Sequence, residues 1–215
     1  MASLRWKIAQ YFEAKWWKRY LGQKPVGAYR EWKANYWKGL LESVELTTQQ
    51  TVKGKVLDAG CGPAGIFLVL ADCEVTAIDP LMGQYNQLAH FNPAMAPYAS
   101  FHQMRMEDIA WKEAFDWVFC MNAINHVEDI KLSMQQLSAS LKPHGHLVLS
   151  VDAHKYNWLR KVFHYLPGDV MHPHQLGLPG YLDLAKAAKL HCMGTILIKE
   201  EPIFQHYLCV FRRMA

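Results

Sequence analysis

The sequence predicts an α/β protein built around a mainly parallel β-sheet, and three observations carry this prediction. From residue 54 onward, short β-rich runs alternate with helical patterns, as they do in βαβ units. A glycine-rich loop follows the first of these runs. The last two β-rich runs are separated only by Glu200-Glu201-Pro202, a connection short enough to join antiparallel neighbours.

Length and composition fit this class. The chain has 215 residues, which favours a single hydrophobic core, and its 51% hydrophobic and 20% charged residues exclude a disordered chain. It contains no run of 18 apolar residues and does not begin with a secretory signal pattern, so we expect a cytoplasmic protein. Its five cysteines lack CxxC spacing, so neither a disulfide framework nor a metal site is expected.

The individual elements follow in chain order. Strands are expected over 55–59, 74–79, 100–104, 115–121, 146–151, 192–199 and 203–212, and helices over 66–71, 82–91, 130–141 and 181–190. In the third of these helices the apolar residues recur at i, i+4, i+7 and i+11. Residues 153–176 predict an ordered loop with a short helix over 157–163.

The first 38 residues differ from the rest of the chain. They carry nine Lys or Arg against two Glu, a net charge of +7, whereas the whole chain has a net charge of +4. They also hold five of the eight tryptophans. Two helices are predicted here: one over 4–20, in which Leu4, Ile8, Phe12, Trp16 and Tyr20 recur every four residues, and one over 29–41.

The glycine-rich loop reads Asp58-Ala-Gly60-Cys-Gly62-Pro-Ala-Gly65 and has the spacing GxGxxG between a strand and a helix. Its glycines allow a nucleotide to approach the backbone, and Asp79 at the end of the next strand can accept hydrogen bonds from ribose hydroxyls. Asp58 discriminates between ligands, because a carboxylate at this place repels a dinucleotide pyrophosphate. The same carboxylate favours the cationic groups of S-adenosylmethionine.

Here the sequence resembles the class I S-adenosylmethionine-dependent methyltransferases of the small-molecule type. Val56-Leu-Asp-Ala-Gly-Cys-Gly-Pro matches their first motif, Ala77-Ile-Asp-Pro their ribose-binding acid, and Met106-Glu-Asp-Ile-Ala-Trp111 their adenine-contacting segment. The resemblance covers residues 54–152. It implies a Rossmann-like, seven-stranded sheet of order 3-2-1-4-5-7-6 with an antiparallel last strand.

The resemblance also implies the cofactor, S-adenosylmethionine, and its product, S-adenosylhomocysteine. Many members have Gly-Asp where this chain has Met104-Arg105, so we expect backbone groups of the following residues to contact the adenine. The implied cofactor-binding residues are Asp58, Gly60, Gly62, Asp79, Pro80, Leu81, Met106, Glu107 and Asn122.

Methyl transfer from a sulfonium is an in-line displacement that needs no metal, and a base is required only when the acceptor must lose a proton. His126 is the candidate base by position, although it could instead pack against the following helix. His172-Pro-His174 could act as a lid or contact the substrate, with His174 a second catalytic candidate; a capping role is the alternative. The nucleophile and amine-binding motifs of nucleic-acid methyltransferases are absent, so a small-molecule acceptor is expected, with its acceptor atom open.

In the resembled family, N-terminal helices cover the cofactor. We therefore expect an N-terminal helical cap over 1–45, a methyltransferase domain over 46–215, and substrate contacts from Tyr29, Tyr36 and Trp37, with His172 as a further contact. The alternatives for the N-terminal segment are an interfacial helix on an anionic membrane, a nucleic-acid grip, or core packing. The alternatives for the chain are a cofactor-binding protein without turnover, a methyltransferase of lipid-like substrates, and a nicotinamide oxidoreductase.

Overall fold

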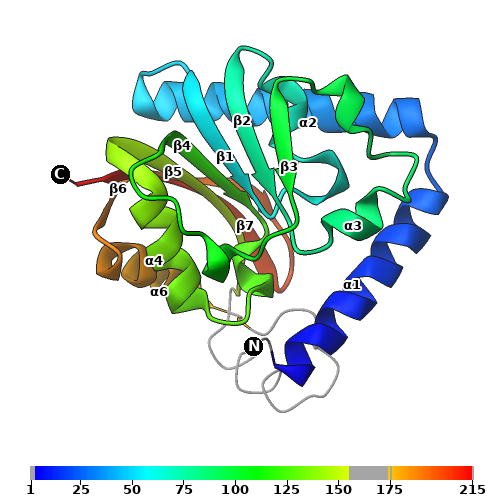
Figure 1. The fold of residues 1–215 in the computed structure, drawn as a ribbon. Helices are drawn as coiled ribbons and strands as arrows, with labels where there is room; N and C mark the ends of the chain where they lie inside the picture. Colours follow the sequence, from blue (N-terminus) through cyan, green and yellow to red (C-terminus); the bar gives the residue numbers. More distant parts are fainter. Residues whose placement is uncertain (1–2, 155–173, 175, 215) are drawn as a thin grey trace.

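A seven-stranded sheet forms the centre of the molecule in the computed structural model, which describes residues 3–154, 174 and 176–214 (Figure 1). The strand order is β3-β2-β1-β4-β5-β7-β6, as the resemblance implied. Strands β1 to β5 are parallel, and β7 runs antiparallel to both β5 and β6. The strands are β1 Gly54–Ala59, β2 Cys73–Ile78, β3 Ala99–His102, β4 Phe115–Met121, β5 Leu141–His154, β6 Leu190–Glu200 and β7 Phe204–Arg213.

Helices cover both faces of this sheet. On one face lie α4 (Ile130–Ser140) and α6 (Leu178–Ala187), whose Met134, Leu137 and Tyr181 are fully buried in one core cluster. On the other face lies α2 (Val26–Thr48), which buries Trp37, Leu40 and Val44 in a second cluster. Because the central strands are covered on both sides, β4 is apolar along nearly its whole length.

The segment after β1 differs from the sequence prediction. Instead of a helix over 66–71, the chain makes two short 3₁₀ turns, Gly62–Ala64 and Ile66–Val69. Only seven residues separate Gly65 from the start of β2 at Cys73. A segment of this length forms too few backbone hydrogen bonds to offset helix nucleation. Helix α2 packs over these turns and covers this part of the sheet.

Two other helices also depart from expectation. Helix α3 (Met82–Tyr85) is a single turn, shorter than the predicted 82–91. Helix α2 continues to Thr48 and packs on the sheet, so the predicted boundary at residue 45 falls inside it; the division into cap and domain stays a prediction. The short helix expected over 157–163, and His172, lie outside the described residues.

Helix α1 (Leu4–Gly22) projects from the sheet toward the carboxyl ends of the parallel strands. Its N-cap is Ser3, whose side chain accepts a hydrogen bond from the backbone N–H of Trp6. The apolar stripe seen in the sequence faces solvent: Leu4, Ile8 and Phe12 are 74%, 41% and 49% exposed. The face turned toward the rest of the protein carries instead Trp6, Gln10, Glu13 and Trp17.

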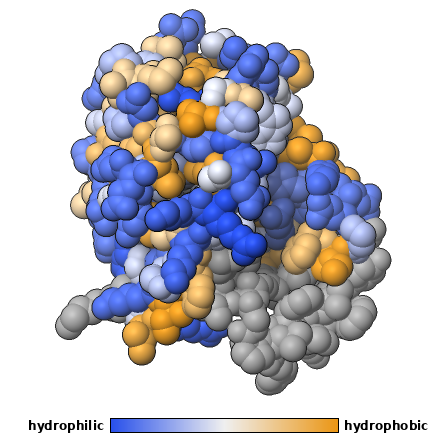
Figure 2. Space-filling model, turned by 90° about the vertical axis from the view of Figure 1, so that its right-hand side faces the viewer, coloured by the Kyte–Doolittle hydropathy of each residue, from blue (hydrophilic) through white to orange (hydrophobic). Residues whose placement is uncertain are grey.

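Figure 2 shows the side of the molecule on which α1 lies, with hydrophilic side chains over much of this face and separate hydrophobic patches between them. Within the described part of the chain, no helix is both long enough and apolar enough to cross a membrane.

Candidate functional site

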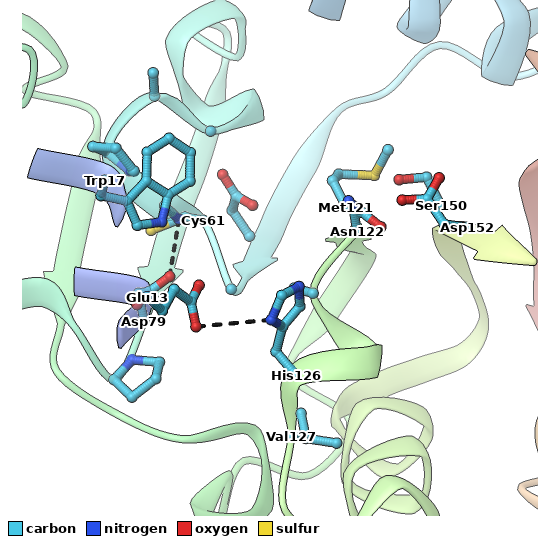
Figure 3. Close-up of a pocket in the computed structure, with 18 of the residues that line it drawn as sticks. Glu13, Trp17, Cys61, Asp79, Met121, Asn122, His126, Val127, Ser150 and Asp152 are labelled. Atoms are coloured by element: carbon cyan, nitrogen blue, oxygen red, sulfur yellow. Dashed lines mark hydrogen bonds and ion pairs between the residues drawn. The ribbon is translucent and has the colours of Figure 1, made fainter. Parts of the chain in front are cut away.

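A cavity of about 700 Å³ lies at the carboxyl ends of the parallel strands, beneath α1 and α2. This edge is where parallel α/β sheets bind ligands, because the loops that follow the strands converge there. Figure 3 shows Glu13 and Asp79 on one side of the cavity, and Ser150 and Asp152 on the other, with His126 between them.

The glycine loop forms one wall of the cavity. Gly60 and Gly62 have φ angles of 71° and 58°, in the left-handed region that favours glycine. At Gly60 a Cβ atom would also lie 2.4 Å from the Cβ of Ala123. The loop backbone therefore follows a path that side chains at these positions would prevent.

Asp79 follows β2 and is buried. Its carboxylate accepts hydrogen bonds from the backbone N–H of Gly62, at 3.0 Å, and of Leu81, at 2.8 Å. Burial raises the pKa of Asp79 to about 6, against the opposing effect of these hydrogen bonds. The carboxylate is thus fixed against the glycine loop with its charge poorly compensated.

Asp58 lies at the end of β1 and is 1% exposed. The backbone N–H of Phe67 donates to its carboxylate at 3.1 Å. A Cβ atom at Gly65 would lie 2.5 Å from the Asp58 Oδ2, so the loop glycine makes room for the carboxylate. Burial, and to a lesser extent the charge of Asp79, raise the pKa of Asp58 to about 7.

Glu13 on α1 supplies a third carboxylate, which the sequence prediction missed. Burial and the neighbouring Asp79 raise its pKa to about 7, while hydrogen bonds from Trp17 and Gln10 oppose the shift. Glu13 Oε2 lies 3.8 Å from His126 Nδ1, so α1 meets the loop after β4 at this point. Its only sequence signal was an acidic residue within a strongly basic segment.

Carboxylates from α1, β1 and β2 thus converge on one cavity. Burial is the main cause of their raised pKa values, and a cationic ligand placed beside them would favour their ionised forms. A pyrophosphate would instead be repelled. These three carboxylates fit the cationic sulfonium and ammonium groups of S-adenosylmethionine. They do not fit the pyrophosphate of a dinucleotide.

Most of the other expected cofactor-binding residues lie in the same cavity lining. Pro80, Met106, Glu107 and Asn122 line the cavity. Glu107 Oε1 accepts hydrogen bonds from two backbone N–H groups, those of Glu128 and Asp129, so this oxygen holds the loop before α4. The backbone at Met106 and Glu107 is therefore the part expected to contact an adenine.

Comparisons with known proteins agree with this geometry. Residues 57–149 match the methyltransferase domain family. A ubiquinone biosynthesis O-methyltransferase of Rickettsia felis is 26% identical over 113 residues, covering 52% of this chain and 46% of the relative. A tRNA U34 carboxymethyltransferase of Pseudoalteromonas translucida is 34% identical over 128 residues, covering 55% of this chain and 37% of the relative.

The chain contains a segment, residues 57–149, that matches the methyltransferase domain family. It matches less than half the length of each of these two relatives.

Among solved structures, the fold is similar to the Burkholderia thailandensis 1,6-didemethyltoxoflavin-N1-methyltransferase, with a TM-score of 0.66 and 15% identity. The match covers 100% of this chain and 92% of that one, whose structure holds 1,6-didemethyltoxoflavin and S-adenosylhomocysteine. The similarity shows that the sheet and the helices packed on it form a fold that this other protein shares.

The aromatic residues of α2 divide into two groups in this methyltransferase fold. Tyr36 and Trp37 line the cavity, as expected of substrate contacts, and the Trp37 indole N–H donates to the Ala64 carbonyl at 3.0 Å. Tyr29 does not line the cavity. It is buried between the two N-terminal helices and the His90 ring, so the sequence prediction misplaced it.

Lys33 was not singled out in the sequence. Its ammonium lies 4.0 Å from the Trp37 ring centroid and 5.2 Å from that of Tyr36, inside the cavity lining. Burial lowers the pKa of Lys33 to about 8, and the charge of Asp58 partly offsets this shift. A positively charged side chain of the protein therefore interacts with Asp58.

Two further predicted residues lie outside the cavity lining. Leu81 contributes its backbone N–H to Asp79 and so orients that carboxylate. His174 Nε2 lies 3.1 Å from the Glu128 carbonyl oxygen, in a shallow depression beside α4, so it does not meet His126. Of the histidine candidates in the described chain, His126 alone faces the cavity as predicted.

The cavity wall opposite the glycine loop is formed by the ends of β5 and β7. His206 Nδ1 lies 2.6 Å from Asp152 Oδ1, and both residues line the cavity. The sequence prediction singled out neither, because they are 54 residues apart and become neighbours only through strand pairing.

Proposed function

We propose that this chain transfers the methyl group of S-adenosylmethionine to a small-molecule acceptor. The observation that carries the proposal is the convergence of Asp58, Asp79 and Glu13 on the cavity at the glycine loop. When bound, S-adenosylmethionine supplies a methyl group activated by a sulfonium. The names of the relatives, among them a ubiquinone biosynthesis O-methyltransferase, support a methyl transfer activity.

Each wall of the cavity has a defined task in this function. Asp79, held against the glycine loop, binds the ribose hydroxyls, and Asp58 and Glu13 favour the cationic end of the cofactor. The indole rings of Trp6 and Trp17 on α1 cover this region and exclude water. A small acceptor is favoured because side chains of both α1 and α2 line the binding space. His126 as a base stays a prediction.

Calorimetric titration tests the ligand class. S-adenosylhomocysteine should bind and NAD should not, because the loop carboxylates repel a pyrophosphate. Tighter binding of NAD would contradict the proposal. Turnover of small phenols and amines, followed as release of S-adenosylhomocysteine, distinguishes an enzyme from a protein that only binds the cofactor.

Asp79→Ala tests the position of the ribose. Loss of charge-assisted hydrogen bonds should weaken S-adenosylhomocysteine binding by about 1.5–3 kcal/mol, or roughly 10- to 150-fold. Asp72→Ala, at an exposed position just before β2, is the matched control and should leave the affinity unchanged. An unaltered dissociation constant for Asp79→Ala would place the ribose elsewhere.

A second candidate function, methylation of a lipid-like acceptor at a membrane surface, is favoured by the outer face of α1. Leu4, Ile8 and Phe12 are exposed there, and the same helix carries Lys7, Lys15 and Lys18. Such a helix suits the surface of an anionic bilayer.

Co-sedimentation with vesicles tests this candidate. The protein should bind vesicles that contain anionic lipid, and salt should weaken the binding. Phe12→Ser should reduce it. Leu46→Ser, at an 81% exposed position on α2, is the control that should not. Equal binding to neutral vesicles, or none to either kind, would contradict the membrane role.

A further inference from the structure

Asp152 on β5 and His206 on β7 form a side-chain pair, which the pairing of these two strands brings together. They are register partners in the antiparallel ladder of β5 and β7, so their side chains leave the sheet on the same face. The 2.6 Å contact joins Asp152 Oδ1 to His206 Nδ1. The pair stands at the carboxyl end of β5 and within the cavity lining.

The contact fixes how the imidazole holds its proton. An ionised carboxylate only accepts hydrogen bonds. Nδ1 of His206 is therefore protonated, and its N–H donates the hydrogen bond that Asp152 accepts. In the neutral ring Nε2 then keeps its lone pair and can accept a proton. An oriented histidine of this kind suits the role of a general base for an acceptor that lies within hydrogen-bond reach of Nε2.

Other charged and polar groups surround the pair. Tyr36 on α2 and Lys199 near the end of β6 both line the cavity, and each interacts electrostatically with Asp152. Lys199 is itself paired with Glu201. The pair therefore occupies a polar end of the cavity, to which Ile198 and Phe204 add apolar surface.

The position of the pair separates it from His126. In Figure 3 Asp152 lies across the cavity from Asp79 and Glu13, whereas His126 contacts Glu13. If the Asp79 side takes the nucleoside of the cofactor, the remaining space for an acceptor lies at the Asp152 side. Tyr36 and Phe204 also line the cavity, and their aromatic rings favour an aromatic acceptor.

We propose that His206, oriented by Asp152, is the general base that deprotonates an aromatic hydroxyl acceptor bound at this end of the cavity. The inference rests on the proposed function. The acceptor hydroxyl gives its proton to Nε2 of His206, and an oxygen lone pair forms the bond to the methyl carbon. The carbon–sulfur bond breaks, and its electron pair stays on sulfur, which becomes a neutral thioether.

Binding of 4-nitrocatechol provides a readout that needs no turnover, because its phenolate absorbs visible light. With S-adenosylhomocysteine bound, the wild-type protein should hold this phenol as the phenolate at lower pH than free solution does. His206→Gln should shift the midpoint back by about one pH unit, a tenfold change. Asp152→Asn should shift it in the same direction.

Turnover with two acceptors separates a base from a structural role. His206→Gln should slow methylation of catechol by about 10²- to 10⁴-fold. It should slow the methylation of 4-nitrocatechol much less, because this more acidic phenol loses its proton without a strong base. His191→Gln, exposed on β6, is the control and should change neither rate.

The outcomes separate this inference from the proposed function. If S-adenosylhomocysteine fails to bind the wild-type protein, the proposed function fails. If it binds but 4-nitrocatechol does not, the acceptor site is wrong. If His206→Gln methylates catechol as fast as the wild-type protein does, or leaves the phenolate midpoint unshifted, His206 is not the general base. If His126→Gln alone produces the acceptor-dependent loss, the base is His126 and not His206.

Discussion

Helices α1 and α2 follow one another in the chain and are both rich in aromatic residues, yet they attach to the protein in different ways. Helix α2 lies on the sheet and buries Leu40 and Val44. Helix α1 buries only Ala9, Gln10 and Leu21. It is held at its N-terminal end by polar contacts, including one from the Trp6 indole to the His126 carbonyl at 3.2 Å. Thus α2 belongs to the core, whereas α1 is a cover over the cavity.

Truncating an apolar side chain on each helix should give the largest difference in stability between α2 and α1. Leu40→Ala leaves a void against the sheet and should lower the free energy of unfolding by about 2–5 kcal/mol. Ile8→Ala, on the exposed face of α1, should change it by less than about 0.5 kcal/mol. Urea unfolding of both variants measures the difference. Similar losses would mean that α1 is packed as firmly as α2.

The inner face of α1 should respond to pH. The pKa of Glu13 is raised from 4.5 to about 7, so the folded protein retains a proton there that the unfolded chain has released. Glu13 therefore reduces stability increasingly as pH rises from 4.5 to 7, and the whole cost persists above that range.

Glu13→Gln should therefore raise the free energy of unfolding of the ligand-free protein at pH 8 by about 1–3 kcal/mol. It should have little effect at pH 4. Urea unfolding at both values checks this, with the exposed Glu42→Gln on α2 as the control. A loss of stability at pH 8 would show that Glu13 is compensated by neighbouring groups.

The smallest effect is expected at the tip of α1. Trp6→Phe removes the indole N–H donor to His126 and should cost about 0.5–1.5 kcal/mol locally. Amide hydrogens near the start of α1 should then exchange faster, by roughly 2- to 12-fold. Trp32→Phe, at an exposed ring, should leave their exchange unchanged. Unaltered exchange in Trp6→Phe would mean that the other contacts of α1 suffice.

Much of the fold could be predicted because local pattern and burial agree. The run 115–121 is apolar nearly throughout because helices cover both faces of β4, and the spacing of Ile130, Met134 and Leu137 matches the buried face of α4. The helix expected over 66–71 did not form because the segment before β2 is too short, and α2 covers that part of the sheet instead.

The site was predicted less completely, for a physical reason. Asp58 and Asp79 belong to a local motif at strand ends, so short-range pattern was enough to find them. Glu13 and the Asp152–His206 pair depend on contacts between distant segments. On α1 the spacing of the apolar residues marks the face that is exposed to solvent. The inner face carries Gln10 and Glu13, which line the cavity, so the pattern did not reveal it.

Lys33 gives the cavity a resident cation. Its ammonium lies over the Trp37 ring and interacts favourably with Asp58, and with its pKa near 8 it is mostly charged at neutral pH. A positively charged ligand that enters meets carboxylates already partly balanced by this side chain, and like charges repel it from Lys33. Binding of a cationic ligand therefore changes the electrostatic field of the site less than three uncompensated carboxylates would suggest, because Lys33 already offsets part of the charge of Asp58.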